Sequence, residues 1–100
     1  MENVSPALAE AIATWEAAEA AFRSAVVADP SNDHDKLFEA KEAAELALIT
    51  HPCLTIDDVR AKATIAIRDG NVFDSLTNCN IDGEHVQMIF LRSILGEAVP

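Results

Sequence analysis

The longest stretch of this chain without glycine or proline runs from residue 7 to residue 29. It follows Ser5-Pro6, and a serine cap with proline at the first helical position is a typical helix start. Large apolar residues recur through the stretch at steps of four, three, seven and four: Leu8, Ile12, Trp15, Phe22 and Val26. This heptad-like spacing predicts one helix from Pro6 to about Ala28, roughly 34 Å long at about 1.5 Å per residue.

Glu19 interrupts the apolar seam of this first helix. Three interpretations fit a carboxylate at such a position. Its side chain reaches the rim of the helix interface, it pairs with Arg23 at i+4, or it marks a polar site. The sequence alone leaves all three open.

A second helix is predicted after the turn-forming sequence Asp-Pro-Ser-Asn-Asp at residues 29–33. Asn32 or Asp33 serves as its cap, and it ends near Thr50, because His51 precedes a proline and is disfavoured in a helix. The connection is short, so we expect the first two helices to form an antiparallel hairpin. Three acidic residues of the second helix are expected on its solvated outer face: Glu39, Glu42 and Glu45.

Thr55 is predicted to cap a third helix, with Asp58 three residues later as a shorter version of the capping box. Apolar residues at helical spacing mark the side of this helix that we expect to be buried. They are Ile56, Val59, Ala63, Ala66 and Ile67.

Gly70 stands just past the expected end of the third helix, where glycine commonly terminates a helix. Residues 71–81 are predicted to hold a short helical turn followed by a loop. The turn is built on Val72, Phe73 and Leu76.

A last helix is predicted from about Gly83 to Leu95, with Asp82 as its cap and Gly96 at its end. Apolar residues cover more than half of its circumference: Val86, Met88, Ile89, Phe90, Leu91, Ile94 and Leu95. A helix of this kind should be buried centrally or in an oligomer interface.

Eighteen of the 100 residues are alanine, whereas only five are aromatic and three are glycine. This composition favours helices over sandwiches and barrels, which need aromatic and β-branched strands with many turns. Residues 1–100 are therefore predicted to form a single all-α domain, a long antiparallel helical hairpin followed by two shorter helices. The long first helix and the apolar last helix predict a homodimer, in which two chains pack as a dimeric helical bundle.

The chain carries 17 acidic and seven basic residues, a net charge of −10, and residues 1–50 contribute −7 of it. No basic cluster exists to neutralise phosphates, so nucleic acids and anionic membranes are not expected as partners, whereas a basic protein is allowed. The first residues lack a signal-peptide pattern, and no apolar run is long enough to span a bilayer. We therefore expect a cytoplasmic protein in which Cys53 and Cys79 are free thiols.

Four residues are of types that bind zinc: His51, Cys53, Cys79 and His85. Their spacing, His-x-Cys and Cys-x5-His, departs from the closely spaced pairs of structural zinc sites. The other interpretation is two small thiols and two surface or capping histidines, and on it we predict no metal and no cofactor. The sequence also lacks a glycine-rich phosphate loop, a Glu-x-x-His pair and a nucleophile elbow, so no catalytic residue is predicted.

Trp15 with Ala17-Ala18, the sequence Leu-Phe-Glu-Ala at residues 37–40, and the stretch from Pro52 to Ala63 carry a resemblance. In these features the chain resembles small helical proteins of unknown function from alphaproteobacteria. The resemblance covers about residues 12–67. It implies a bacterial helical protein, and it brings no assigned activity and no site residue.

Together these observations predict a non-catalytic interaction or regulatory protein whose acidic helical surface binds another, basic protein. The alternative is a zinc-binding protein in which Cys53, Cys79 and at least one of His51 and His85 converge. A small enzyme is a third interpretation, which a cleft containing Glu19 or His85 would favour.

Overall fold

The computed structural model describes residues 4–96. This part of the chain is mostly helical, as predicted, and adds a two-stranded antiparallel ribbon. No helix in it combines the length and the hydropathy needed to cross a membrane. The elements are α1 Pro6–Ala28, α2 Asp35–Thr50, α3 Ile56–Arg68, α4 Gly70–Asn78, β1 Asn80–Ile81, β2 Glu84–His85 and α5 Val86–Ile94.

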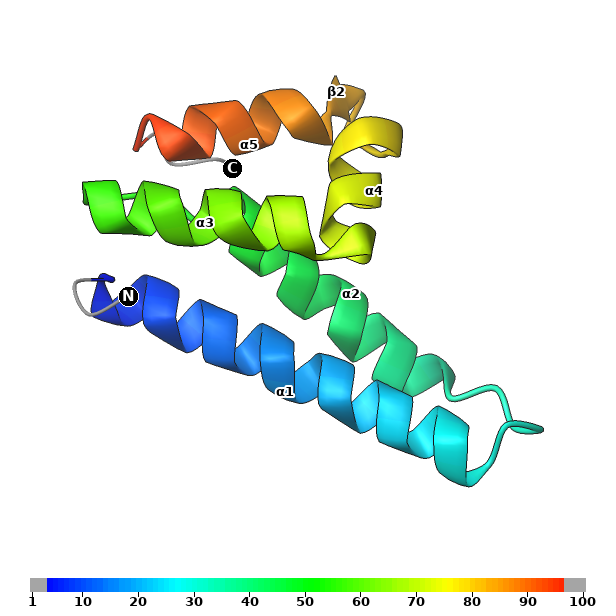
Figure 1. Cartoon of the computed structure of the whole chain (residues 1–100). Coiled ribbons are helices and arrows are strands. Elements are labelled where there is room, and N and C mark those ends of the chain that lie inside the picture. The colour runs from blue at the N-terminus through cyan, green and yellow to red at the C-terminus, as the bar shows by residue number, and fades with distance from the viewer. Residues whose placement is uncertain (1–3, 97–100) are drawn as a thin grey trace.

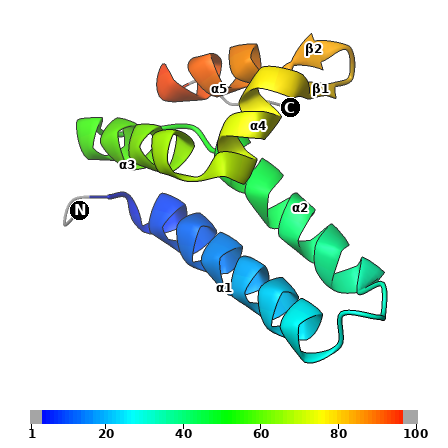
Figure 2. The same ribbon diagram turned by 45° about the vertical axis from the view of Figure 1, so that its right-hand side comes forward.

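The two longest helices, α1 and α2, lie side by side (Figure 1, Figure 2). α1 occupies the range predicted for it. Near the turn that joins the two helices, the rings of Phe22 and Phe38 have centroids 5.5 Å apart, and the Lys41 ammonium lies over both rings. Leu8 and Trp15 of α1 are buried, whereas both aromatic rings near the turn remain partly open to solvent.

The start of α2 differs from the prediction of a cap at Asn32 or Asp33. The helix begins at Asp35, and His34 stands at the cap position with a φ of 21°. The reason is that the preceding residues close the turn instead. The Asn32 side chain accepts a hydrogen bond from the amide of Asp33, and the His34 ring lies 2.8 Å from the Asp29 carbonyl oxygen.

The second half of the chain packs against one end of the α1–α2 pair (Figure 1). In both views α3 and α5 lie one above the other, and α4 with the ribbon connects them (Figure 1, Figure 2). All five helices described here contribute to one apolar core. Its buried members are Leu8, Trp15, Ala44, Leu48, Ile49, Ala66, Val72, Val86 and Phe90.

The structure corrects the prediction of only a short turn within residues 71–81. Gly70 does not terminate α3, since it is the first residue of α4, a nine-residue helix. Asp69 causes the difference, because its carboxylate accepts hydrogen bonds from the amides of Asn71 and Val72 and thereby caps the new helix. Residues 4–96 therefore hold one helix more than the four predicted.

The predicted start of the last helix near Gly83 is also wrong. Asp82 and Gly83 have φ values of 50° and 83°, which suit the two central positions of a tight β-hairpin turn. They join β1 to β2, so α5 begins only at Val86. The predicted end is correct, since Gly96 has a φ of 87° just past the helix.

The prediction for the buried side of α3 is only partly correct. Ala66 is buried as predicted, and Val59 and Ala63 are half-buried. Ile56 and Ile67 are 67% and 79% exposed. The buried residues of this helix are Asp58, Ala61, Lys62 and Ala66. Two charged side chains thus lie inside the fold, which apolar periodicity cannot indicate, and both find the polar partners described below.

Candidate functional site

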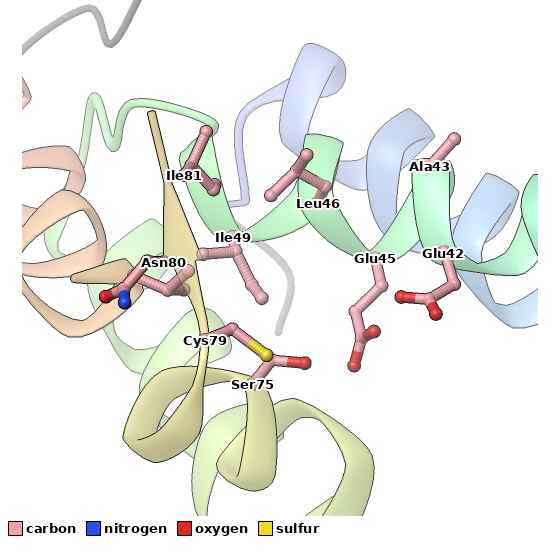
Figure 3. Close-up of a pocket in the computed structure, with 10 residues that line it drawn as sticks. Glu42, Ala43, Glu45, Leu46, Ile49, Ser75, Cys79, Asn80 and Ile81 are labelled. Carbon is pink, nitrogen blue, oxygen red and sulfur yellow. The ribbon is translucent and has the colours of Figure 1, made fainter. Parts of the chain in front are cut away.

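A cavity of about 300 Å³ lies between α2, α4 and β1 (Figure 3). This volume is at the lower end of the range for small-molecule sites. Its walls are mostly apolar, with a few polar groups among them. The lining residues are Glu42, Ala43, Glu45, Leu46, Ile49, Ser75, Cys79, Asn80, Ile81 and Val86.

Glu45 is the charged group that this cavity buries. Its side chain extends from α2 toward Ser75 and Cys79 and is only 5% exposed (Figure 3). One carboxyl oxygen, Oε1, is shielded from solvent and has no hydrogen-bond partner. The prediction of a solvated face holds for Glu39 and Glu42, which are exposed, and is wrong for Glu45.

The surroundings of Glu45 disfavour its charged form. Burial raises the pKa of this carboxyl above its usual value. The Lys41 ammonium opposes the effect, whereas the carboxylates of Glu42, Asp69 and Glu19 add to it. Glu45 is therefore a carboxyl that would gain from a cationic or hydrogen-bond-donating partner.

The position of α2 explains why Glu45 turns inward. Ala44, Glu45, Leu48 and Ile49 form one buried stripe, because α2 packs against α1 on one side and against α5 on another. Glu45 stands one helical turn before Ile49 and so shares its side of the helix. The spacing of four residues between Glu45 and Ile49 is visible in the sequence, but the helix α4, which covers this side of α2, was not predicted.

Glu19 links α1 to the second half of the chain. Its carboxylate lies 3.6 Å from the Arg23 guanidinium, which confirms one of the three interpretations of this residue. The same carboxylate accepts a hydrogen bond of 3.3 Å from the Asn71 side chain on α4. Glu19 is buried and paired, and it does not line the cavity.

Lys62 is a buried ammonium with three hydrogen-bond acceptors. Its Nζ donates to the carbonyl oxygens of Ile49 and His51 at 2.8 and 2.6 Å, and to Ser93 Oγ at 2.6 Å. It also lies 5.1 Å from the centroid of the Phe90 ring. Burial lowers the pKa of Lys62 to about 8. The group joins the end of α2 to α5, which is a structural role.

Asp58 fastens the start of α1 to α3. Its carboxylate accepts hydrogen bonds from the amide and hydroxyl of Ser5, at 2.8 and 2.6 Å, and from the amide of Leu54 at 2.8 Å. Burial alone would raise the pKa of Asp58, but these bonds outweigh it and lower the pKa to about 2. The predicted Thr55 cap is confirmed, because Thr55 Oγ1 accepts from the Asp58 amide.

The four residues considered as zinc ligands occupy different environments. Cys53 is buried, and its amide donates to the Ser93 carbonyl oxygen, while Cys79 is exposed at the end of α4 beside the cavity. His51 is half-buried next to Pro52, and His85 is exposed at the start of α5. Within residues 4–96 the structure gathers no group of three or more His, Cys, Asp or Glu side chains suited to a metal ion.

Comparison with protein-family models, curated proteins and solved structures found no match to this chain.

Proposed function

We propose that this chain is a non-catalytic protein-interaction domain that forms a homodimer and binds a basic protein through its acidic α1–α2 surface. The observation that carries the proposal is a strip of large apolar side chains exposed to solvent. We call it the apolar strip, and its members are between 50% and 78% exposed. They are Leu54, Ile56, Met88, Leu91 and Leu95.

The members of the apolar strip lie on α5, just after its end, and at the start of α3. Met88 and Leu91 on α5 and Leu95, the residue that follows its last turn, repeat at steps of three and four, which places them on one side. Leu95 then adjoins Leu54 and Ile56 around a groove of about 260 Å³. Single exposed apolar residues need no explanation, but a contiguous patch of this kind marks an interaction surface.

A second copy of the chain fits the size of the apolar strip. The exposed fractions of its five members correspond to roughly 600 Å² of surface, against about 800 Å² per partner in a stable interface of ordinary size. Polar residues around the apolar strip would supply the remaining buried area of the interface. In a symmetric dimer the same patch serves both subunits, so no separate binding surface is required.

The charge distribution supports separate roles for the apolar strip, which would bind a second copy, and the acidic α1–α2 surface, which would bind a basic protein. Near the apolar strip, Arg92 pairs with Glu84, and α3 carries both an acidic residue, Asp57, and a basic one, Arg60, three residues later. Like charges therefore do not keep two copies apart at this end, although the whole chain carries −10. Residues 1–50 hold −7 of that charge, which favours a basic partner for α1 and α2.

The proposed dimer can be tested by sedimentation analysis of variants that carry charged residues in the apolar strip. We expect a dimer for the wild-type chain and a monomer for Leu91→Glu combined with Leu95→Glu. Val27→Glu is the matched control, since Val27 is 83% exposed on α1 and lies outside the strip. A monomeric wild type, or a double variant that stays dimeric with unchanged helicity, contradicts the proposal.

The acidic surface is tested separately, by co-purification of a partner at low and high salt. Glu39→Gln with Glu42→Gln removes two exposed charges from α2, and we expect it to weaken retention of a basic partner. Lys36→Gln on the same helix is the control and should not weaken it. If the double variant retains the partner as well as the wild type does, and high salt does not weaken retention, the acidic surface is not the binding site.

A further inference from the structure

We propose that the cavity between α2, α4 and β1 binds a small organic cation, an ammonium or amidinium group on an apolar body, with Glu45 as its counter-ion. The inference is independent of the proposed interaction function. No residue of the apolar strip lines the cavity, and the site is formed by one copy of the chain.

The first argument is the unmet hydrogen-bonding capacity of Glu45. A buried carboxyl oxygen without a donor costs free energy, and native folds rarely leave one. The other buried charged side chains described here are matched: Lys62 has three acceptors, Asp58 has donors from Ser5 and Leu54, and Glu19 has Arg23 and Asn71. Glu45 lines a cavity large enough for the missing partner to be a ligand.

One other buried side-chain nitrogen or oxygen atom in residues 4–96 has no hydrogen-bond partner. It is Nε of Arg92, whose guanidinium already pairs with Glu84 through another nitrogen. Arg92 does not line the cavity. Of these two side chains within residues 4–96, Glu45 is the one that lines the cavity.

The charge of the ligand follows from the groups around Glu45. Glu42 lines the cavity as a second carboxylate, and no lysine, arginine or histidine lines it. Of the charged groups that act on Glu45, three are acidic and only Lys41 is basic. An anion would be repelled here, whereas a cation would form a charge-assisted hydrogen bond in a partly dry environment.

The shape of the ligand follows from the remaining walls. Ala43, Leu46, Ile49, Ile81 and Val86 form an apolar lining, and Leu46 is partly open to solvent. A volume of about 300 Å³ accommodates a body of the size of one ring with its head group. Ser75, beside the Glu45 carboxyl, offers a hydroxyl that can accept a second hydrogen bond from an ammonium group (Figure 3).

The probes for the test are benzylamine, its neutral counterpart benzyl alcohol, and benzoate. The full chain is titrated with each of them while amide chemical shifts are followed by NMR. We expect benzylamine to shift resonances of the cavity-lining residues and to bind at least about tenfold more tightly than the other two. The absence of any shift with benzylamine overturns the proposal, and so does equal binding of benzylamine and benzyl alcohol.

Three variants locate the interaction. Glu45→Gln keeps the size of the side chain and removes its charge, so benzylamine affinity should fall about tenfold or more. Glu39→Gln makes the same change at an exposed position of α2 and should leave the affinity unchanged. Ser75→Leu retains Glu45 but fills the cavity, and it should abolish binding.

Urea unfolding of each variant shows that the fold is retained before its affinity is interpreted. Glu45→Gln replaces an unpartnered buried carboxyl, so we expect it to fold. If it does not, Ser75→Leu still decides the question. Unchanged affinity in either of the two cavity variants, or shifts confined to residues outside the cavity, refutes the site.

Discussion

Replacing the carboxylate that fastens α1 to α3 should have a large effect on stability that depends on pH. Asp58 is fully buried and accepts three hydrogen bonds from Ser5 and Leu54. Asp58→Asn keeps the size of the side chain but turns one acceptor oxygen into a donor. The new NH₂ group and a Ser5 or Leu54 donor then face each other, so neither finds an acceptor there. The negative charge that strengthened all three hydrogen bonds is also lost.

The pKa of Asp58 sets the magnitude. Its fall from an ordinary value of 3.8 to about 2 corresponds to about 2–3 kcal/mol at pH 7, because one pKa unit is worth about 1.4 kcal/mol. The folded form holds the proton less tightly than the unfolded form. This contribution is therefore fully present above pH 3.8 and is lost as the pH falls from 3.8 through 2.

The assay is urea unfolding of the wild type and Asp58→Asn at pH 7 and at several values down to pH 2. We expect the variant to be less stable by about 2–3 kcal/mol at pH 7 and the gap to narrow below pH 3.8. Asp57→Asn makes the same change at the neighbouring position and should cost little. If the two variants lose equal stability, or the gap stays constant to pH 2, the argument from the three hydrogen bonds is wrong.

Four further outcomes can be measured on the same chain. Lys62→Met leaves three buried acceptors without a donor and should cost about 3 kcal/mol in urea unfolding at pH 7. Because the folded-state pKa of Lys62 is lowered to about 8, its ordinary value being 10.5, the wild type should gain stability between pH 8 and 10.5 relative to this variant. Gly83→Ala places a side chain at a φ of 83° and should lower the free energy of unfolding by about 1 kcal/mol, whereas Gly70→Ala, where φ is not positive, should not. A thiol reagent should modify the exposed Cys79 much faster than Cys53, whose pKa is raised by burial, and equal rates would contradict the buried position.

Local sequence signals predicted the parts of the fold that depend on neighbouring residues. Pro6 and the apolar repeat after it identified α1, and Thr55 identified the start of α3. The same kind of reasoning failed where one residue had two local interpretations. Gly70 suits a helix end, but Asp69 before it caps the next helix. Asp82 suits a cap, but with Gly83 it forms the turn of the ribbon.

The buried polar groups could not be predicted from local signals. Lys62 and Asp58 lie on α3 at positions that a helical pattern assigns to solvent, and their partners are distant in the sequence. Ser5 is 53 residues from Asp58, and Ser93 is 31 residues from Lys62. The Glu45 cavity was missed for the same reason, because its far wall belongs to α4 and β1. Only the packed structure brings these walls together.

The hydrogen bonds of Lys62 determine how far the chain can be shortened. The acceptor on α5, Ser93, lies in the last turn of that helix, and its carbonyl oxygen also accepts a hydrogen bond from the amide of Cys53. A chain that stops before Ser93 would leave the buried Lys62 ammonium without one of its acceptors and the Cys53 amide without its acceptor. We therefore expect a chain without α5 not to fold, so that α1 and α2 do not form a stable structure in it. The five helices should therefore unfold as a single cooperative unit.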